Sequence, residues 1–227
     1  MVQTLKIADR RTSVDLVFDH LYAEIVAMRL LPGAKISEAE IASLFDISRQ
    51  PVRDAFSRLE NLDLLLIRPQ RATTVKRFSS KAINTARFVR AAVEAEVLRR
   101  AARVCGKQGN ALLEERLSDQ QAAVTDNDYD RFRSLDYAFH AALCTVGEVD
   151  FAFDVIARDK AKVDRLCVLG MAGDERMELL LSDHINIASM IRNNDEQGAV
   201  DVGMLHLSRL DDTIAAIKEE HSDYFED

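Results

Sequence analysis

One aspartate and three histidines in the second half of the chain have the types and spacing of a metal-binding set. Asp136 and His140 are four residues apart, so on a helix their side chains lie only about 40° apart on one face. His184 and His206 each fall among apolar residues at helical spacing, so both imidazoles are expected to point into a core. One carboxylate with three imidazoles suits Zn²⁺, Ni²⁺ or a similar divalent ion and leaves positions open for another ligand.

The alternative is that these residues are ordinary core side chains. A single histidine on an apolar helix face more often bonds a backbone carbonyl than a metal. A buried carboxylate without a cation is costly, however, and the alternative requires four such coincidences. The sequence therefore predicts a divalent metal site, with Zn²⁺ or Ni²⁺ favoured, formed by Asp136, His140, His184 and His206.

Two arginines are candidates for binding an anionic effector beside this metal. Arg90 lies on the apolar face of its predicted helix, with Glu94 one turn further on. Its planar guanidinium fits a carboxylate, and the alternative is a buried ion pair with Glu94. Arg165 is a second candidate, although its helix face also contains Arg158 and Lys162, so the alternative there is a solvated face.

A second set of chemically informative residues occupies the segment SRQPVRDA, residues 48–55. Arg49 and Arg53 are four apart on one helix face, and Gln50 lies beside them near the start of the helix. Exposed Arg and Gln at this end suit base edges in the major groove, and Ser48 with the first N–H groups suits a phosphate. The alternative is a solvated face whose arginines pair with nearby acids.

The segment 48–55 must be positioned by the elements of the N-terminal third of the chain, which we expect to be three helices and a hairpin. Apolar periodicity predicts helices over about 12–30, 38–45 and 49–61. Two β-prone runs follow at 64–67 and 73–76, with Arg71 in the tip between them. This order is typical of a winged helix-turn-helix, and the sequence places it in a DNA-binding domain over residues 1–78.

The rest of the chain is predicted to be helical throughout, because it contains no convincing strand and the whole chain has only 8 Gly and 3 Pro. The expected helices cover about 80–105, 108–124, 127–146, 149–169, 174–193 and 195–221. The predicted fold class is therefore mainly α, with an N-terminal winged helix-turn-helix and a C-terminal all-α antiparallel helical bundle over 79–227. We expect this second domain to bind the metal and the effector.

Composition restricts the class of protein. The net charge of −8 argues against a chain that coats nucleic acid along its whole surface. The first 78 residues nevertheless have 12 Lys+Arg against 10 Asp+Glu, and the remainder has 18 against 28. No apolar run approaches the roughly 20 residues that span a bilayer, and the N-terminus lacks a secretory apolar stretch. With three widely spaced cysteines expected to be reduced, we predict a cytoplasmic protein without membrane contact.

The N-terminal third resembles the signature of GntR-family regulators. The resemblance rests on Pro32-Gly33, Ile36-Ser37-Glu38, Ile41-Ala42, the run from Ile47 to Phe56, and Arg58-Leu59-Glu60. In that family, the residues matching this segment meet the operator. The resemblance therefore implies DNA contacts by Ser48, Arg49, Gln50 and Arg53, with Gln70 and Arg71 in the wing.

Three positions depart from the family pattern. The family usually has Gly where this chain has Asp63, and Gly in the wing where it has Ala72. One branch often has Arg where this chain has Ala39. The resemblance thus implies a wing turn of different geometry and one contact fewer to DNA.

The remainder resembles the FadR C-terminal domain, called FCD, which is the ligand-binding module of one GntR subfamily. The matching pieces are Arg90 with Glu94, Asp136 with Phe139-His140, Arg165, Asp183-His184, and Met204 to Leu207. In metal-binding members, the residues matching Asp136, His140, His184 and His206 hold the cation. An organic acid completes the coordination, and the residue matching Arg90 lines the same pocket.

The family resemblance implies a homodimer, built largely through the helical domain 79–227, that binds a palindromic operator. With the metal and arginine candidates, the sequence predicts a repressor that responds to a small organic acid. We do not expect an enzyme. Two alternatives stay open at this point: a metal-dependent enzyme of hydrolase type, and a regulator whose effector is the metal itself. A metal site could activate water, but no general base is placed beside it by sequence, and the DNA-binding segment would go unexplained.

Overall fold

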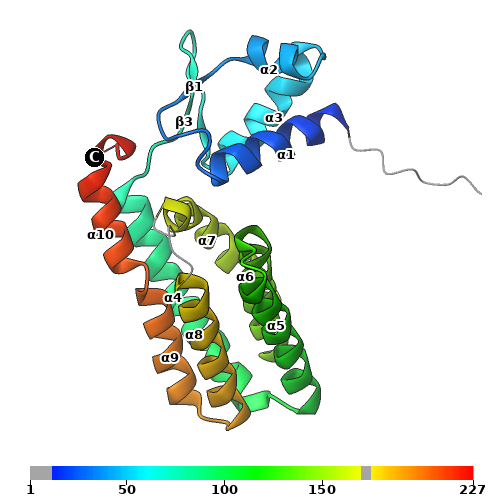
Figure 1. Ribbon diagram of the computed structural model, residues 1–227, viewed down its shortest axis with the longest axis vertical. Helices are drawn as coiled ribbons and strands as arrows, with labels where there is room; N and C mark the ends of the chain where they lie inside the picture. The colour runs from blue at the N-terminus through cyan, green and yellow to red at the C-terminus, as the bar shows by residue number, and fades with distance from the viewer. Residues whose placement is uncertain (1–11, 170–174, 227) are drawn as a thin grey trace, which may run out of the picture. The chain divides into compact units, whose positions relative to one another are not determined.

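The computed structural model describes residues 12–169 and 175–226, which form two compact units (Figure 1). The first unit contains the described residues up to Phe78 together with residues 223–226, and the second contains Ser79–Ser222. The predicted range of the second domain, 79–227, therefore differs from the structure at its end, where residues 223–226 belong to the first unit. The backbone N–H of Phe78 donates to the carbonyl of Tyr224 at 2.8 Å, and that of Glu226 donates to the carbonyl of Phe78 at 2.9 Å.

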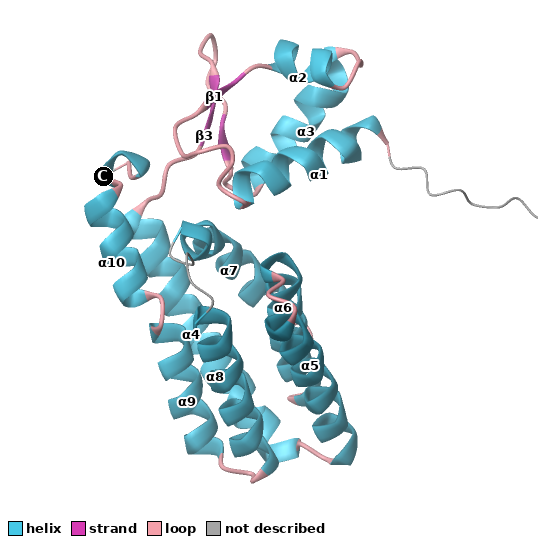
Figure 2. Ribbon diagram, in the orientation of Figure 1, coloured by secondary structure: helices cyan, strands magenta, loops and turns pink. Residues whose placement is uncertain are grey.

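The first unit combines three helices with a small sheet (Figure 2). Its elements are α1 (Ser13–Val26), β1 (Lys35–Ile36), α2 (Glu38–Leu44), α3 (Arg49–Asn61), β2 (Leu65–Leu66) and β3 (Thr73–Val75). The strand order is β1-β3-β2, and both pairs are antiparallel, with Lys35 opposite Thr74 and Leu65 opposite Val75. The sequence pattern does not predict β1, because a two-residue strand shows no alternation.

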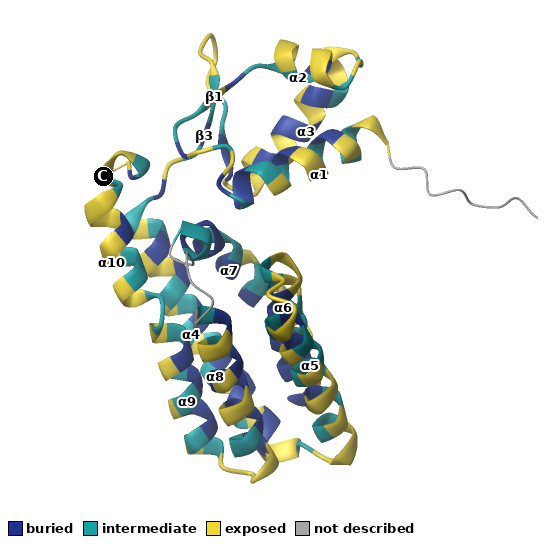
Figure 3. Cartoon of the chain, in the orientation of Figure 1, coloured by how far each residue is buried: buried dark blue, intermediate teal, exposed yellow. Residues whose placement is uncertain are grey.

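The helices of this unit are fixed by caps and by one shared core. Ser37 caps α2, since its hydroxyl accepts from the N–H of Ala39 at 3.2 Å. Along α3, every third or fourth residue is apolar and buried, and this stripe packs against α1. The buried α3 residues are Val52, Ala55, Phe56 and Leu59. The opposite face of α3 is therefore left exposed (Figure 3).

All regular secondary structure described in the second unit is helical. Its helices are α4 (Ser80–Val104), α5 (Lys107–Thr125), α6 (Tyr129–Val146), α7 (Ala152–Leu169), α8 (Glu175–Arg192), α9 (Glu196–Ser208) and α10 (Asp211–Glu220). A 3-10 turn at Ser222–Tyr224 begins at the last residue of this unit and continues into the first. Helix α4 packs against α7 and α9, while α5 packs against α6 and α8. The predicted fold class, mainly α with a winged helix-turn-helix and an all-helical C-terminal part, is confirmed.

The prediction of one helix over 195–221 is wrong, because the helix breaks at Arg209. The N–H of Arg209 bonds the carbonyl of His206, three residues back, at 3.2 Å instead of the carbonyl four residues back. Its guanidinium meanwhile donates to Asp183 on α8. Residues 204–221 contain no Gly or Pro that would mark this break in the sequence. The break instead accompanies the contact between Arg209 and Asp183.

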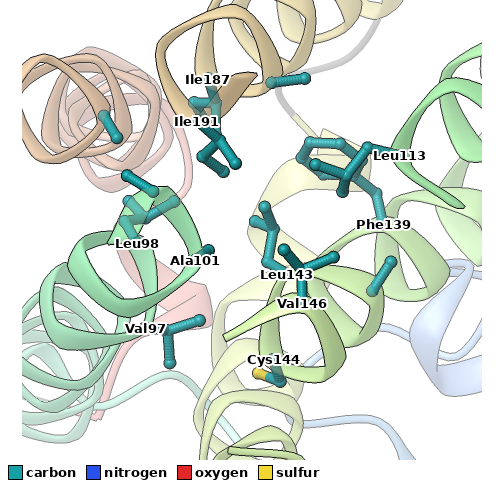
Figure 4. Packing of buried hydrophobic residues seen from close by; sticks show 14 of the residues in the cluster. Val97, Leu98, Ala101, Leu113, Phe139, Leu143, Cys144, Val146, Ile187 and Ile191 are labelled. Carbon is teal, nitrogen blue, oxygen red and sulfur yellow. The ribbon is translucent and has the colours of Figure 1, made fainter. Parts of the chain in front are cut away.

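The core of the second unit brings apolar side chains of α4, α6 and α8 together (Figure 4). It includes Leu98 of α4, Phe139 and Leu143 of α6, and Ile187 and Ile191 of α8. All five side chains are almost fully buried. This close packing fixes the three helices relative to one another, and hence the polar residues one turn away from the core.

Candidate metal centre and nucleic-acid interface

Helix α6 presents an aspartate and a histidine on its buried face. Asp128 caps the helix, since its carboxylate accepts from the N–H of Arg131 at 3.0 Å. With this start, Asp136 and His140 fall on the same face as Phe132 and Phe139, and all four are buried. The helical period thus carries two polar side chains into the interior of the second unit.

Two further histidines reach the same place from α8 and α9. His184 is fully buried and His206 is 7% exposed. The ring centroids of His184 and His206 lie 4.7 Å apart, and each lies within 6 Å of His140. One potential ligand atom from each of these residues and from Asp136 lies within 4.8 Å of all the others. The structure therefore brings together the four residues that the sequence singles out.

The protonation of His184 leaves one ring nitrogen facing this cluster. Gln120 donates through Nε2 to the carbonyl of Leu135 at 3.2 Å, so its Oε1 is the acceptor for His184 Nδ1 at 2.8 Å. Burial lowers the pKa of His184 well below its usual value, so the ring is neutral with its proton on Nδ1. Nε2 then carries a lone pair, lies 3.5 Å from Asp136 Oδ1, and has no hydrogen-bond partner.

The other two histidines also have acidic neighbours behind the ring. His140 Nδ1 lies 3.0 Å from Glu94 Oε2. Its Nε2 has no hydrogen-bond partner and lies 4.0 Å from Asp136 Oδ1. His206 Nδ1 lies 3.6 Å from Asp183 Oδ2. Acceptors behind metal-ligating histidines commonly fix the ring and its tautomer.

These residues fit a bound divalent ion. The imidazole nitrogens His140 Nε2 and His184 Nε2 are buried without a hydrogen-bond partner, and such orphaned groups are costly unless something binds them. Three imidazoles and one carboxylate are donors that Zn²⁺ and other borderline ions accept. The site therefore has the composition, burial and unsatisfied atoms of a metal centre.

A lysine that the sequence pattern does not single out lies against the aspartate. Lys160 on α7 is buried, and its Nζ lies 2.9 Å from both Asp136 Oδ2 and Asp164 Oδ1. Burial would lower the pKa of Lys160, but the two carboxylates hold it well above its usual value. Asp136 thus has one oxygen held by Lys160 and the other directed toward the histidines.

A cavity of about 60 Å³ adjoins the cluster and is lined largely by basic and apolar side chains. The basic and acidic residues that line it are Arg90, Arg133, Lys160, Arg176, Arg209, Asp136 and Asp164. Such a cavity favours a compact anion over a long acyl chain.

The two predicted effector-binding arginines lie in different places. Arg90 lines the cavity and also forms the ion pair that the sequence allows as the alternative, with Nε donating to Glu94 Oε1 at 2.8 Å. Burial would raise the pKa of Glu94, but Arg90 and His140 hold it well below its usual range. Arg165 is buried, and so does not lie on a solvated face, but it is not among the described residues that line the cavity.

The sequence pattern does not identify four of the basic residues that line the cavity: Lys160, Arg133, Arg176 and Arg209. Lys160 follows Arg158 on a helix rich in charged residues, and such a pattern indicates that the lysine side chain lies in solvent. It is instead the i,i+4 spacing from Lys160 to Asp164 that could have indicated a paired, buried cation.

In the first unit, the segment predicted to contact DNA is exposed. Ser48, Arg49, Gln50 and Arg53 all lie on the open side of α3 at its N-terminal end. Gln50 donates to Asp54 at 2.9 Å, and Arg53 pairs with Glu38 of α2 rather than with an acid of its own helix. The first turn of α3 also offers backbone N–H groups, because the Ser48 side chain forms no capping hydrogen bond.

The wing carries the other two predicted contact residues. Gln70 and Arg71 are exposed between β2 and β3, and Gln70 adopts a left-handed backbone with φ of 59°. Asp63, where the resembled family has Gly, is also left-handed, with φ of 62°, a conformation that Asp tolerates better than most residues. The departure at Asp63 therefore keeps the turn that Gly would allow.

Comparisons with known protein families agree with both units. Residues 14–75 match the family described as bacterial regulatory proteins, gntR family, and residues 86–209 match the FCD domain. No helix in the described part of the chain is long and apolar enough to cross a bilayer.

Individual proteins are similar along most of the chain. The HTH-type transcriptional repressor RspR of Escherichia coli is 33% identical over 209 residues, which is 92% of each chain. The solved structure of E. coli McbR/YncC has a TM-score of 0.72 at 17% identity and covers 93% of this chain and 100% of that one. A structure of a GntR-type regulator from Rhodococcus sp. RHA1 has a TM-score of 0.71 at 20% identity and covers 89% and 97%. At these identities, the structural likenesses show the fold alone.

Proposed function

Because this chain belongs to the GntR family of transcriptional regulators and carries an FCD domain, we propose that it is a repressor controlled by a small carboxylate bound at a divalent metal. The similarity to RspR, which is named a repressor, supports the direction of control. The observation that carries the sensor role is the buried cluster of Asp136, His140, His184 and His206 with its unsatisfied nitrogens.

In this proposal the four clustered residues hold the ion. A bound divalent ion would supply positive charge that attracts the carboxylate oxygens of the effector. Arg90 and Lys160 line the same cavity and add hydrogen-bond donors for an anion. Gln120 and Glu94 orient two of the imidazoles from behind. Zn²⁺ or Ni²⁺ suits this donor set.

The DNA role is assigned to the exposed start of α3 and to the wing. Arg49, Gln50 and Arg53 would read base edges in the major groove, while Ser48 and the first N–H groups would hold a phosphate. Gln70 and Arg71 of the wing would contact the adjacent backbone. All six side chains are exposed, as this role requires.

Control of DNA by the acid requires a coupling free energy between the two sites. We place it in a homodimer whose two N-terminal units bind the halves of a palindromic operator. Binding of the acid would change the packing of the helices around the cavity and so the spacing of the two units. Operator affinity would then fall.

The DNA assignment is tested by selecting tight binders from a pool of random duplexes with the purified full chain. We expect a palindromic motif, which a two-fold dimer requires. Arg49→Ala and Arg53→Ala should each abolish preference for this motif without changing thermal unfolding. Arg29→Ala is the control, because Arg29 is an exposed arginine that pairs with Glu24 at the end of α1. Preference for the motif that survives both α3 substitutions would contradict the assignment.

The sensor assignment is tested by native mass spectrometry and by operator titration. We expect one divalent ion per chain in the wild type and none in the double variant Asp136→Asn with His184→Ala. Operator affinity is then measured after three treatments: removal of the metal by a chelator, addition of succinate to metal-loaded protein, and addition of succinate to metal-free protein. Release of DNA by succinate only in the presence of metal supports the proposal, whereas release by the chelator alone identifies the metal as the effector.

A further inference from the structure

A cavity adjoins the cluster of candidate metal ligands Asp136, His140, His184 and His206, called the metal cluster below. The basic side chains that line this cavity outnumber the acidic ones. Five basic side chains line it: Arg90, Arg133, Lys160, Arg176 and Arg209. Three of these are matched within the protein. Arg90 pairs with Glu94, Lys160 pairs with Asp136 and Asp164, and Arg209 pairs with Asp183. Of the remaining two, Arg133 has only the exposed Asp130 at 3.6 Å, and Arg176 has no ion pair among the described residues.

Each of these two arginines has a buried nitrogen without a hydrogen-bond partner in the described part of the chain. Arg176 donates through Nη1 to the hydroxyl of Thr213 at 2.6 Å, but its Nε is buried and unsatisfied. Arg133 has a buried and unsatisfied Nη1, and its Nη2 lies 3.6 Å from the exposed Asp130. A buried charged donor without a partner is destabilising, so such donors are typical of a binding site.

The two arginines lie on the same side of the metal cluster. On α6, Arg133 precedes His140 by seven residues, and on α8, Arg176 precedes His184 by eight. At the rise of a helix, these offsets are roughly 10–12 Å along the axis. Since both arginines line the cavity that also touches Asp136 and His140, the cavity extends from the metal cluster toward them.

The wall of the cavity between these ends is apolar or neutral. Phe132, Leu180 and Leu210 supply apolar surface. Tyr129 lines the cavity too, and burial raises the pKa of its phenol, so it stays protonated and can donate a hydrogen bond. A ligand that fits this lining has a short carbon chain with an anionic group at each end.

We propose that the effector is a compact diacid, with one carboxylate directed to the metal cluster and Arg90 and the other bound by Arg133 and Arg176. This inference rests on the proposed function, because it names the class of acid that the sensor site takes. It assigns Arg133 and Arg176 as the residues that distinguish a diacid from a monoacid of the same length.

The test compares matched acids by calorimetric titration of the zinc-loaded full chain. The pairs are succinate with butyrate, glutarate with valerate, and adipate with hexanoate. We expect at least one diacid to bind roughly tenfold or more tightly than its matched monoacid, which is the size of one charge-assisted contact. Equal affinities within every pair would overturn the inference while leaving the sensor function in place.

Substitutions then locate the second carboxylate. Arg133→Met and Arg176→Met should each reduce the diacid preference to within about twofold and leave monoacid affinity unchanged. Arg131→Met on α6 and Arg192→Met on α8 are matched controls, because these exposed arginines pair with Asp126 and Glu114 outside the cavity. A diacid preference that persists in both cavity variants would refute the assignment of these residues.

Folding is checked separately. Each substitution removes one buried nitrogen that has no partner, but Arg176→Met also removes the hydrogen bond to Thr213 and Arg133→Met the contact with the exposed Asp130. The temperature of thermal unfolding of the two cavity variants without ligand should therefore change little. The comparison of acids on the wild-type protein decides the inference even if a variant does not fold. If neither member of any pair binds zinc-loaded protein, the carboxylate sensor role fails together with the diacid assignment.

Discussion

Arg53 on α3 donates two hydrogen bonds to Glu38 at the start of α2, from Nε to Oε1 at 3.2 Å and from Nη2 to Oε2 at 2.9 Å. The acid holds the guanidinium in one orientation and raises the pKa of Arg53 further through that hydrogen bond. Both side chains are partly exposed, so the pair itself adds little to stability. In the proposed complex with DNA, Arg53 would have to share or leave Glu38 to reach a base.

Glu38→Gln is expected to weaken discrimination between operator and random DNA. The substitution removes a negative charge beside α3, the helix proposed to contact DNA, so affinity for random duplexes should rise by roughly two- to fivefold. It also frees Arg53 from its fixed orientation, so operator affinity should rise less. Fluorescence anisotropy at fixed salt measures both. Glu40→Gln, at an exposed position of the same helix, is the control. An unchanged specificity ratio would show that the pair does not orient Arg53 for binding.

Gln120→Leu is expected to weaken metal binding although Gln120 touches no metal. Its Oε1 accepts from His184 Nδ1, and this bond keeps the lone pair on Nε2. Loss of such a partner typically costs about 10- to 100-fold in metal affinity. Competition with a chromogenic zinc chelator measures the change, with Gln121→Leu as the exposed neighbour control. Equal affinities in the two variants would mean that the His184 tautomer is fixed by something else.

Lys160→Met is expected to destabilise the metal-free protein and to make its stability depend on zinc. Without the ammonium, Asp136 and Asp164 remain as two buried carboxylates. Breaking a buried pair in this way costs about 3–5 kcal/mol in the free energy of unfolding. Zinc should restore part of that loss, because the ion would neutralise Asp136.

Urea denaturation with zinc and with chelator measures these two free energies. Lys107→Met is the control, because Lys107 is exposed at the start of α5. A Lys160→Met protein as stable as the wild type in chelator would contradict a structural role for the Lys160 pairs.

Asp63→Val is expected to destabilise the first unit by about 1–2 kcal/mol. Asp63 has a left-handed backbone with φ of 62°, which a β-branched residue adopts only at a cost. Asp63→Gly should change stability by less than about 1 kcal/mol, because Gly relieves the backbone while the contact to Lys76 is lost. Asp63→Asn separates these effects, since Asn tolerates the backbone but removes the charge. Thermal unfolding in which Val and Gly behave alike would exclude backbone conformation as the cause.

The sequence determined the features that depend on local geometry. Asp136 and His140 share a buried face because four residues nearly complete a helical turn, and the N-terminal position of Arg49 follows from the turn before Ser48. The three metal-cluster histidines could be assigned to the interior because each lies in its own apolar stripe. Each of those inferences needs only the periodicity of one segment, which the amino-acid sequence of that segment contains.

Only the tertiary structure decided which segments meet. The pairing of Arg53 with Glu38, the position of Lys160 between two carboxylates, and the break at Arg209 depend on partners that are distant in sequence. The same holds for Arg133 and Arg176, which line one cavity from two helices. A long charged side chain on a helix can be solvated or paired at nearly equal cost, so packing between helices, and not local periodicity, selects its partner.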